Sequence, residues 1–255
     1  MKETRDEVRS IKRAFDILEI LCREKDPKSL AYLHQALGLP KATLARILGT
    51  LEAGGFVERD STQQKYYLGI KFFYYGYAVS ERITEKRVVG PVMKRIRDTC
   101  LETVYIYILH KNRRLCVDCL AGKNDVRVIT HIGDESPLYV GAAGKVILAH
   151  FSKEELEKYF QETELVPFTP GSIVSREPLE KELKLVRQQG YAVSLGEKIS
   201  EVVSVSAPLI DAKGSVRASL TIAAPLERKP EVDNYISLVN AGAEEINKYG
   251  ALKNL

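Results

Sequence analysis

The segment Gly141–Val146, GAAGKV, combines glycines, small residues and a lysine as phosphate-binding loops do. A loop of the GxxxxGK(S/T) type needs a glycine five residues before the second glycine, and a hydroxyl after the lysine. Tyr139 and Val146 occupy those two positions, so the segment does not predict an ATPase. What remains is a small-residue turn entering a helix, whose first amides favour a carboxylate or another small polar group. Close packing of that helix against a sheet explains the pattern equally well.

Other reactive side chains form no catalytic or metal-binding pattern in the sequence. We expect Lys145 to be a solvated residue rather than a ligand contact. Cys116 and Cys119 form a single CxxC, and on a strand they would point to opposite faces and could not chelate one ion together. The four histidines have no sequence partners for a triad, although a site assembled only by the fold stays open. We therefore predict no catalytic residue, no metal and no cofactor.

Composition and charge indicate a globular chain of two domains. The 255 residues are 45% hydrophobic and 28% charged, which is enough apolar material for a sizeable core. No run of about 18 uncharged apolar residues occurs, and the first ten residues mix charges of both signs, so we expect no membrane span, no secretory signal and a cytoplasmic location. Residues 1–75 carry 13 Lys and Arg against 10 Asp and Glu, and the rest carry 25 against 24. The cationic excess at the N-terminus is compatible with nucleic acid binding.

The first third of the chain predicts a helix-turn-helix followed by a hairpin. Apolar residues at helical spacing predict helices over residues 10–26, 29–38 and 40–55. Gly38 suits the end of the second helix, and Pro40 suits the first turn of the third. Alternating residues on either side of 60–64 then predict two short strands, which form a wing.

The third helix of such a unit enters the DNA major groove through its N-terminal end. Arg46 suits a bidentate contact with guanine, and Thr43 a thymine methyl group or a phosphate. The predicted DNA-contacting positions are Lys41, Ala42, Thr43, Ala45, Arg46 and Thr50 on the helix, with Gln64 and Lys65 on the wing. Winged helices also serve as protein-contact modules, so a subunit without DNA affinity is one alternative.

The remaining residues predict a connecting helix and a sensor-like domain. We divide the chain into residues 1–70, a linker helix over 71–89 and a second domain over 90–255. The aromatic residues of the linker pack either within the chain or against a partner subunit. In the second domain, mixed helices and short strands, one of them over 126–132, predict an antiparallel sheet with attached helices, an α+β domain.

Two parts of the chain resemble the IclR family of bacterial transcriptional regulators. The N-terminal third resembles the family's winged helix in GLPKAT, Arg46, Thr50-Leu51, Gly55, Val57, Asp60 and Tyr67-Leu68-Gly69. The segments GDESPLYVGAAGKVILAHF and GYAVSLGEKISEVVSVSAPLIDAKGSVRASLTIAAP resemble two segments of its effector domain. The similarity covers almost the whole chain, in the family's order and spacing.

The resemblance implies a GAF- or profilin-like α/β effector domain with an antiparallel sheet, which binds a small organic effector. The matching effector-binding positions are Ala142, Ala143, Ser194, Ser204, Thr221 and Ala223. It also implies a linker helix used in dimerisation, a homodimer or dimer of dimers, and a palindromic operator in double-stranded DNA. Glu201 stands where the family has glycine, so the adjoining loop differs or brings a carboxylate close to the pocket.

We therefore expect a sequence-specific transcriptional regulator, not an enzyme, whose operator binding responds to a small carboxylate or aromatic acid. Ser194 and Ala223 stand where some relatives carry acidic or hydroxyl groups, so no relative's ligand transfers directly. An enzyme or acyl-binding module with a helical N-terminal appendage is the rival from another class.

Overall fold

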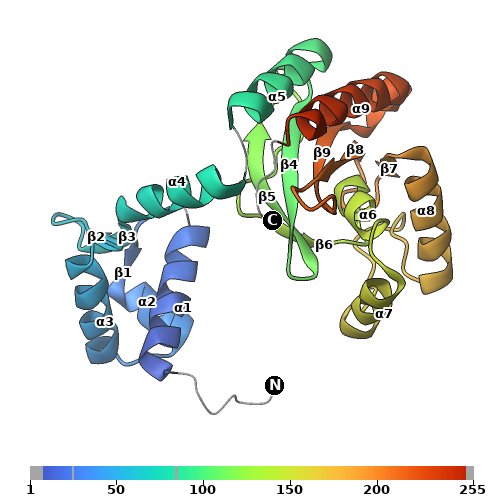
Figure 1. Cartoon of the computed structure of the whole chain (residues 1–255). Helices are drawn as coiled ribbons and strands as arrows, with labels where there is room; N and C mark the ends of the chain where they lie inside the picture. The colour runs from blue at the N-terminus through green and yellow to red at the C-terminus, as the bar shows by residue number, and fades with distance from the viewer. Residues whose placement is uncertain (1–7, 25, 84–85, 251–255) are drawn as a thin grey trace. The chain divides into compact units, whose positions relative to one another are not determined.

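The computed structural model describes residues 8–24, 26–83 and 86–250 and divides the chain into two units, Met1–Val79 and Ser80–Leu255 (Figure 1). The division falls inside helix α4 (Lys71–Ile83), which the sequence assigned to a linker. No helix within these described ranges is long and apolar enough to cross a membrane.

The first unit is a winged helix-turn-helix, as predicted. Its elements are α1 (Arg9–Arg23), β1 (Lys28–Ser29), α2 (Leu30–Leu37), α3 (Lys41–Ala53), β2 (Val57–Arg59) and β3 (Lys65–Leu68). The apolar stripes of the three helices meet at Ile17, Leu33, Leu44 and Leu48, which are fully buried. The strands form an antiparallel sheet in the order β1-β3-β2, so the wing is anchored to the segment before α2.

Local signals set the turn between α2 and α3. The Ser29 hydroxyl accepts a hydrogen bond from the Tyr32 amide at 3.2 Å and caps α2. Gly38 ends that helix with φ of 65°, in the left-handed region that glycine tolerates best. Pro40 immediately precedes α3 and needs no amide donor there. These short-range contacts fix where the N-terminal end of α3 begins.

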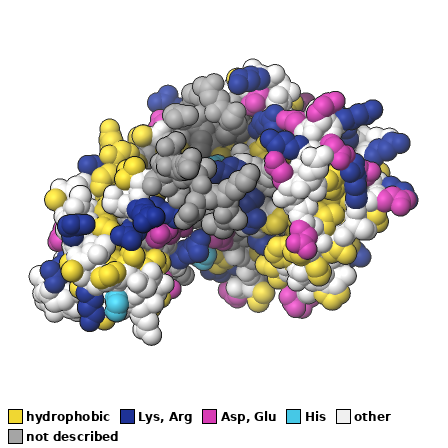
Figure 2. Space-filling view, turned by 90° about the horizontal axis from the view of Figure 1, so that it is seen from below, with side chains coloured by type: hydrophobic (Ala, Val, Ile, Leu, Met, Phe, Trp, Pro, Cys, Tyr) yellow, Lys and Arg dark blue, Asp and Glu magenta, His cyan; other side chains and the backbone are white. Residues whose placement is uncertain are grey.

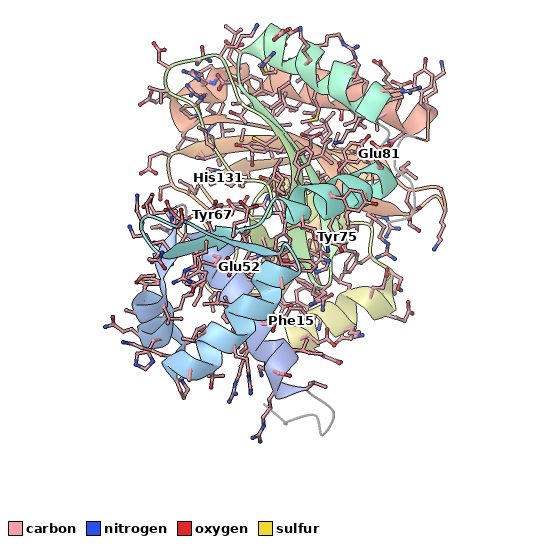
Figure 3. All side chains as sticks on the ribbon, turned by 90° about the vertical axis from the view of Figure 1, so that its left-hand side faces the viewer. Phe15, Glu52, Tyr67, Tyr75, Glu81 and His131 are labelled. Atoms are coloured by element: carbon pink, nitrogen blue, oxygen red, sulfur yellow. The ribbon has the colours of Figure 1, made fainter. Side chains whose placement is uncertain are left out.

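Helix α4 presents aromatic side chains on more than one side. Within the first unit, the rings of Phe72 and Tyr75 lie 5.5 Å and 5.7 Å from the ring of Phe56. Figure 3 shows the Tyr75 side chain on α4. Phe73 and Tyr74 are instead 74% and 69% exposed. Packing within the chain is therefore confirmed for part of the aromatic cluster, and contact with a partner subunit stays a prediction for the exposed part.

The second unit is an α+β domain built on one antiparallel sheet, as predicted. Its strands follow the order β6-β5-β4-β9-β8-β7, with bounds β4 (Thr103–His110), β5 (Arg113–Leu120), β6 (Glu135–Pro137), β7 (Ala192–Leu195), β8 (Val202–Ile210) and β9 (Val216–Pro225). Helices α5 (Lys86–Cys100) and α9 (Val232–Lys248) cover one face. Helices α6 (Ala142–Leu148), α7 (Lys153–Glu162) and α8 (Arg176–Gln189) lie on the other side (Figure 1), and the 3-10 helix η1 (Leu226–Glu231) precedes α9.

Alternation along the central strands gives the two faces different chemistry. In β8, Val203 and Val205 point into the main apolar core with α5 and α9. Ser204 and Ser206 lie between them and face the opposite side, because successive strand residues point to opposite faces. The Ser206 hydroxyl lies 2.8 Å from that of Thr221 on β9. The face toward α6 is therefore polar at its centre.

The predicted strand over residues 126–132 is wrong, because this segment is an irregular loop. The Val128 carbonyl accepts hydrogen bonds from the Thr103 hydroxyl at 2.7 Å and the Tyr105 hydroxyl at 2.9 Å. The Thr130 amide donates to the same tyrosine oxygen. Side chains of β4 thus bind the backbone groups of this loop, which would pair with a neighbouring strand if the loop were a strand. The edge strand of the sheet is β6.

Substituting Gly144 should destabilise the second unit. An added Cβ would lie 2.7 Å from the carbonyl carbon of Leu138, and this backbone cannot yield without moving α6. We expect Gly144→Ala to lower the free energy of unfolding by about 1–3 kcal/mol, measured by urea denaturation. Gly49→Ala makes the same change in α3 with open space around it, and should be neutral or stabilising by about 0.5–1 kcal/mol. Equal stability of Gly144→Ala and the unsubstituted chain would contradict the packing described.

Candidate functional site

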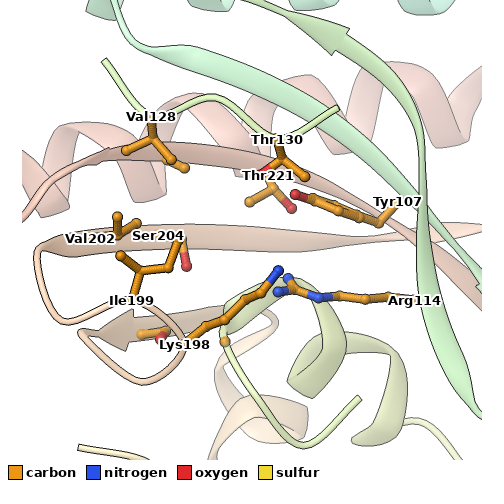
Figure 4. Close-up of a pocket in the computed structure, with 12 residues that line it drawn as sticks. Tyr107, Arg114, Val128, Thr130, Lys198, Ile199, Val202, Ser204 and Thr221 are labelled. Atoms are coloured by element: carbon orange, nitrogen blue, oxygen red, sulfur yellow. The ribbon is translucent and has the colours of Figure 1, made fainter. Parts of the chain in front are cut away.

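A cavity of about 50 Å³ lies over the polar face of the sheet (Figure 4). Its walls come from strands β4, β5, β8 and β9, the loop before β6, the turn before α6 and the segment from β7 to β8. Its lining residues are Tyr107, Arg114, Val128, Thr130, Gly141, Ser194, Lys198, Ile199, Val202, Ser204, Thr221 and Ala223. The cavity therefore combines hydroxyls, two cations and a few apolar side chains.

Four of the six predicted effector-binding residues line this cavity: Ser194, Ser204, Thr221 and Ala223. Ala142 and Ala143 do not line it; both are fully buried at the start of α6. Glu201, which the sequence suggested could approach the pocket, lines a neighbouring groove instead. The structure thus brings the strand residues together; contact of any of these positions with an effector stays a prediction.

The turn before α6 is bonded to a carboxylate of the chain itself. Gly141 donates its amide hydrogen to Oε2 of Glu197 at 3.1 Å, and Lys145 donates to Oε1 of the same side chain at 2.6 Å. Glu197 is 7% exposed and lies in the segment between β7 and β8. The sequence suggested that the first amides of this helix, those of Ala142, Ala143 and Gly144, bind a ligand. The amide just before them, that of Gly141, is bound to Glu197, and ligand contact of the other three stays a prediction.

Lys145 is buried, and the expectation of a solvated side chain is wrong. Its side chain is 1% exposed, and its ammonium group donates to Glu197, to Oε1 of Glu182 at 2.9 Å and to the carbonyl of Val193 at 3.1 Å. Three acceptors match the three ammonium hydrogens. The lysine therefore joins α6, α8, β7 and the segment that follows β7.

Arg114 is the main residue that sequence reasoning missed. It is 6% exposed, its guanidinium carbon lies 4.9 Å from the centre of the Tyr107 ring, and its Nε has no hydrogen-bond partner within the described part of the chain. Burial lowers the pKa of Arg114, whereas the charge of Glu197 raises it. Among the described residues Arg114 makes no ion pair, and the Glu197 carboxylate, whose charge acts on it, is shared with Lys145 and the Gly141 amide.

Lys198 adds a second cation to the same end of the cavity. Its ammonium group lies beside the Arg114 guanidinium (Figure 4). Burial is the larger cause that lowers the pKa of Lys198, and the charge of Arg114 lowers it further. Alternation with exposed Arg113 could have indicated that Arg114 points inward, but no local signal marks Lys198, which lies in a loop.

Cys116 and Cys119 lie on the same face of β5, so the prediction of opposite faces is wrong. Tyr107 pairs with Cys116 and Tyr105 with Cys119, because the pairing shifts by one residue at a β-bulge that contains Val117. Burial raises the pKa of the Cys116 thiol to about 12 and also raises that of Cys119. Among the described residues, no group of three or more His, Cys, Asp or Glu side chains is placed to hold a metal ion.

The predicted DNA-contacting residues of α3 lie on one exposed side of the helix. Lys41, Ala42, Ala45, Arg46 and Thr50 are exposed, Thr43 is half-buried, and Leu44 and Leu48 face the core. On the wing, Gln64 is exposed and Lys65 half-buried. Figure 2 shows Lys and Arg side chains on the surface of this unit, at the left of the view.

Two of these polar groups already make local hydrogen bonds. Thr50 donates its hydroxyl to the carbonyl of Arg46 at 3.0 Å, and Gln64 donates its side-chain amide to the carbonyl of Ser61 at 2.6 Å. The Arg46 guanidinium, by contrast, makes no ion pair or side-chain hydrogen bond with the described residues. Arg46 therefore presents an exposed guanidinium that can bind a new acceptor.

A winged helix-turn-helix joined to an α+β domain with a polar cavity defines a transcription regulator with a separate sensing domain. The model of the IclR helix-turn-helix domain matches residues 10–61, and that of the bacterial transcriptional regulator IclR C-terminal domain matches residues 78–248. The chain belongs to the IclR family of bacterial transcriptional regulators, and the resemblance noted in the sequence is confirmed.

Individual relatives agree with this assignment. The HTH-type transcriptional repressor AllR of Escherichia coli is 31% identical over 247 residues, covering 96% of this chain and 91% of its own. The HTH-type transcriptional regulator KipR of Bacillus subtilis is 33% identical, covering 78% and 79%. The structure of Thermotoga maritima IclR matches with a TM-score of 0.82 and 26% identity, over 96% of this chain and 99% of that one.

A more distant structure shares the fold. The IclR homolog of Microbacterium hydrocarbonoxydans, complexed with 4-hydroxybenzoate, matches with a TM-score of 0.84 and 21% identity over 94% of this chain and 98% of that one.

Removing one partner of the buried Lys145–Glu197 pair should lower the free energy of unfolding more than removing both partners. We expect Lys145→Met to lower the free energy of unfolding by about 3 kcal/mol or more, because it leaves a buried carboxylate without its cation. In a Glu197→Gln background the same substitution should cost much less, and urea denaturation of the four proteins would measure this coupling. Strictly additive effects would show that the two side chains do not stabilise each other.

Proposed function

We propose that this regulator reads a palindromic operator as a dimer and that a small carboxylate, bound in the effector cavity, changes its affinity for DNA. The observation that supports the effector chemistry is the buried Arg114 guanidinium, which lines the cavity and whose Nε has no hydrogen-bond partner among the described residues. An anion that enters the cavity supplies the missing charge and hydrogen-bond acceptors. As a DNA-binding regulator, the protein works in the cytoplasm.

The DNA-reading surface in this proposal is the exposed side of α3, with the wing beside it. Arg46 presents a guanidinium suited to the two acceptors of guanine, and Lys41 lies at the N-terminal end that enters the major groove. Ala42 and Ala45 offer only methyl groups, which suit contact with a thymine methyl or close approach of the backbone. Lys65 on the wing suits a phosphate contact.

Dimerisation through the linker helix supplies the twofold symmetry that a palindrome requires. The exposed Phe73 and Tyr74 side chains of α4 support this proposal, because exposed aromatic clusters mark contact surfaces. A dimer or a dimer of dimers would satisfy the same requirement. The effector then shifts the population between DNA-binding and non-binding arrangements by its difference in affinity for them.

The cavity in this proposal binds its ligand without transforming it. Burial raises the pKa values of Tyr107, Cys116 and Cys119, which keeps all three groups protonated and weakly nucleophilic. Lys145 is bound to two carboxylates. The relatives AllR and KipR are named as transcriptional regulators.

Selection of duplex DNA from a random pool would test the DNA-reading surface. We expect the unsubstituted protein to enrich a palindromic motif and Arg46→Ala to bind it about ten- to a hundredfold more weakly, because a bidentate contact with guanine contributes about 1–3 kcal/mol. Arg23→Ala, which removes one exposed cation from α1, serves as the matched control and should retain most affinity. No enrichment by a folded protein at low salt would contradict operator reading.

Arg114→Met should raise the thermal stability of the ligand-free protein and lower its affinity for the effector. The substitution removes an uncompensated buried charge, so the ligand-free protein should melt at a higher temperature. It also removes the anion partner, so carboxylates from a panel of aliphatic and aromatic acids should bind at least tenfold more weakly.

Calorimetry and thermal shift would measure both effects. Arg113→Met is the control, because Arg113 makes an exposed ion pair with Glu135 at 3.3 Å and points away from the cavity. If no acid in the panel shifts the melting temperature or alters DNA binding, the carboxylate assignment is wrong.

A further inference from the structure

The cavity is too small to hold a whole organic effector. A water molecule needs about 10–15 Å³ of such space, so about 50 Å³ admits a carboxylate and one or two carbon atoms. A groove of about 630 Å³ adjoins the cavity and shares its walls Val128, Ile199 and Val202. That size falls in the range of about 300–1,000 Å³ that ligand sites occupy.

The cavity has a charged end and an apolar end. Arg114 and Lys198 bring their cationic groups together at one end, whereas Val128, Ile199 and Val202 lie at the other (Figure 4). These apolar side chains are the ones that also line the groove. A ligand whose anionic group meets the cations therefore points its remaining atoms toward the groove.

The groove continues the apolar end. Its further walls include Val126, Ile129, Pro225 and Leu226. Val126 is 67% exposed, and Ile129 is 52% exposed. Apolar side chains held in this way around a concave surface gain free energy when an apolar group covers them.

Charges at the groove disfavour a second anionic group. Glu201 and Glu227 contribute carboxylates to its lining. Among the described residues of the lining, Arg127 is the one basic side chain, and it donates hydrogen bonds to the backbone carbonyls of Asn124 and Asp125 at 3.2 Å and 3.5 Å. The two carboxylates outnumber the one cation, so the groove lining disfavours a second anionic group at the distal end of a ligand.

We propose that the effector is an amphipathic monocarboxylate, with its carboxylate between Arg114 and Lys198 and its apolar body in the groove past Ile199. This inference rests on the proposed function, since it assumes that the cavity binds the effector. It adds the direction in which the ligand lies and the class to which it belongs.

A series of straight-chain acids from acetate to octanoate tests the proposal by calorimetry on the full-length protein. Once the chain leaves the cavity, each added methylene should lower the Kd about fourfold, as burial of one methylene predicts. Octanedioate, of the same length, should bind far more weakly than octanoate. Val126→Ser should weaken octanoate binding severalfold and leave acetate binding unchanged, whereas Val174→Ser, at another exposed valine, should change neither.

The outcomes separate this inference from the proposed function. Equal affinity for acetate and octanoate would overturn the two-part site and leave the carboxylate cavity standing. Failure of every acid to bind would overturn both. Octanedioate binding as tightly as octanoate, or unchanged octanoate binding by Arg114→Met, would overturn the ligand class or its orientation. If Val126→Ser instead alters the oligomeric state, the groove is a contact between copies of the chain, and the proposal is wrong.

Discussion

The buried ion pair between Lys145 and Glu197 is the interaction on which the geometry of the effector domain depends. It joins helix α6 to the segment after β7, and the additional bonds of Lys145 include helix α8 and strand β7 in the same network. The Glu197 carboxylate also holds the turn before α6 through the Gly141 amide. Lys198 and Ile199 follow directly in the chain, so the pair positions both the charged and the apolar contribution of this segment to the cavity.

The alternation of side chains along the sheet divides structural and binding roles between its two faces. The face toward α5 and α9 is apolar and forms the main core, which supplies most of the hydrophobic free energy of this domain. The opposite face carries short hydroxyl side chains from β8 and β9, and the buried cation of Arg114 is added from β5. Substitutions on the cavity face therefore change the chemistry of the cavity lining while leaving the main core intact.

The parts of the fold that local chemistry determines could be predicted from the sequence. Gly38 and Pro40 indicated the turn before α3, because each acts within a few residues of itself. Features that depend on distant residues could not be predicted. The partner of Lys145, Glu197, is 52 residues further along the chain. The backbone groups of Val128 and Thr130 bind the hydroxyl of Tyr105 instead of a neighbouring strand.

The cavity was predicted in part for the same reason. Ser204, Thr221 and Ala223 were found through the family pattern, and alternation on regular strands places them on one face. The bulge at Val117 is invisible in the sequence, because the extra residue has the same type as an ordinary strand residue. Alternation along β5 indicates that Arg114 points inward, but the sequence does not indicate that its Nε lacks a hydrogen-bond partner.

The occupied amide of Gly141 has a consequence for how effector choice changes during evolution. A backbone amide is present whatever the residue, so a site that bound its ligand through such amides would keep its preference for anions across homologues. Here Glu197 uses that amide, and the cationic groups that line the cavity are the side chains of Arg114 and Lys198. Two single-residue substitutions would therefore remove both cations from the cavity lining while the backbone stays as it is.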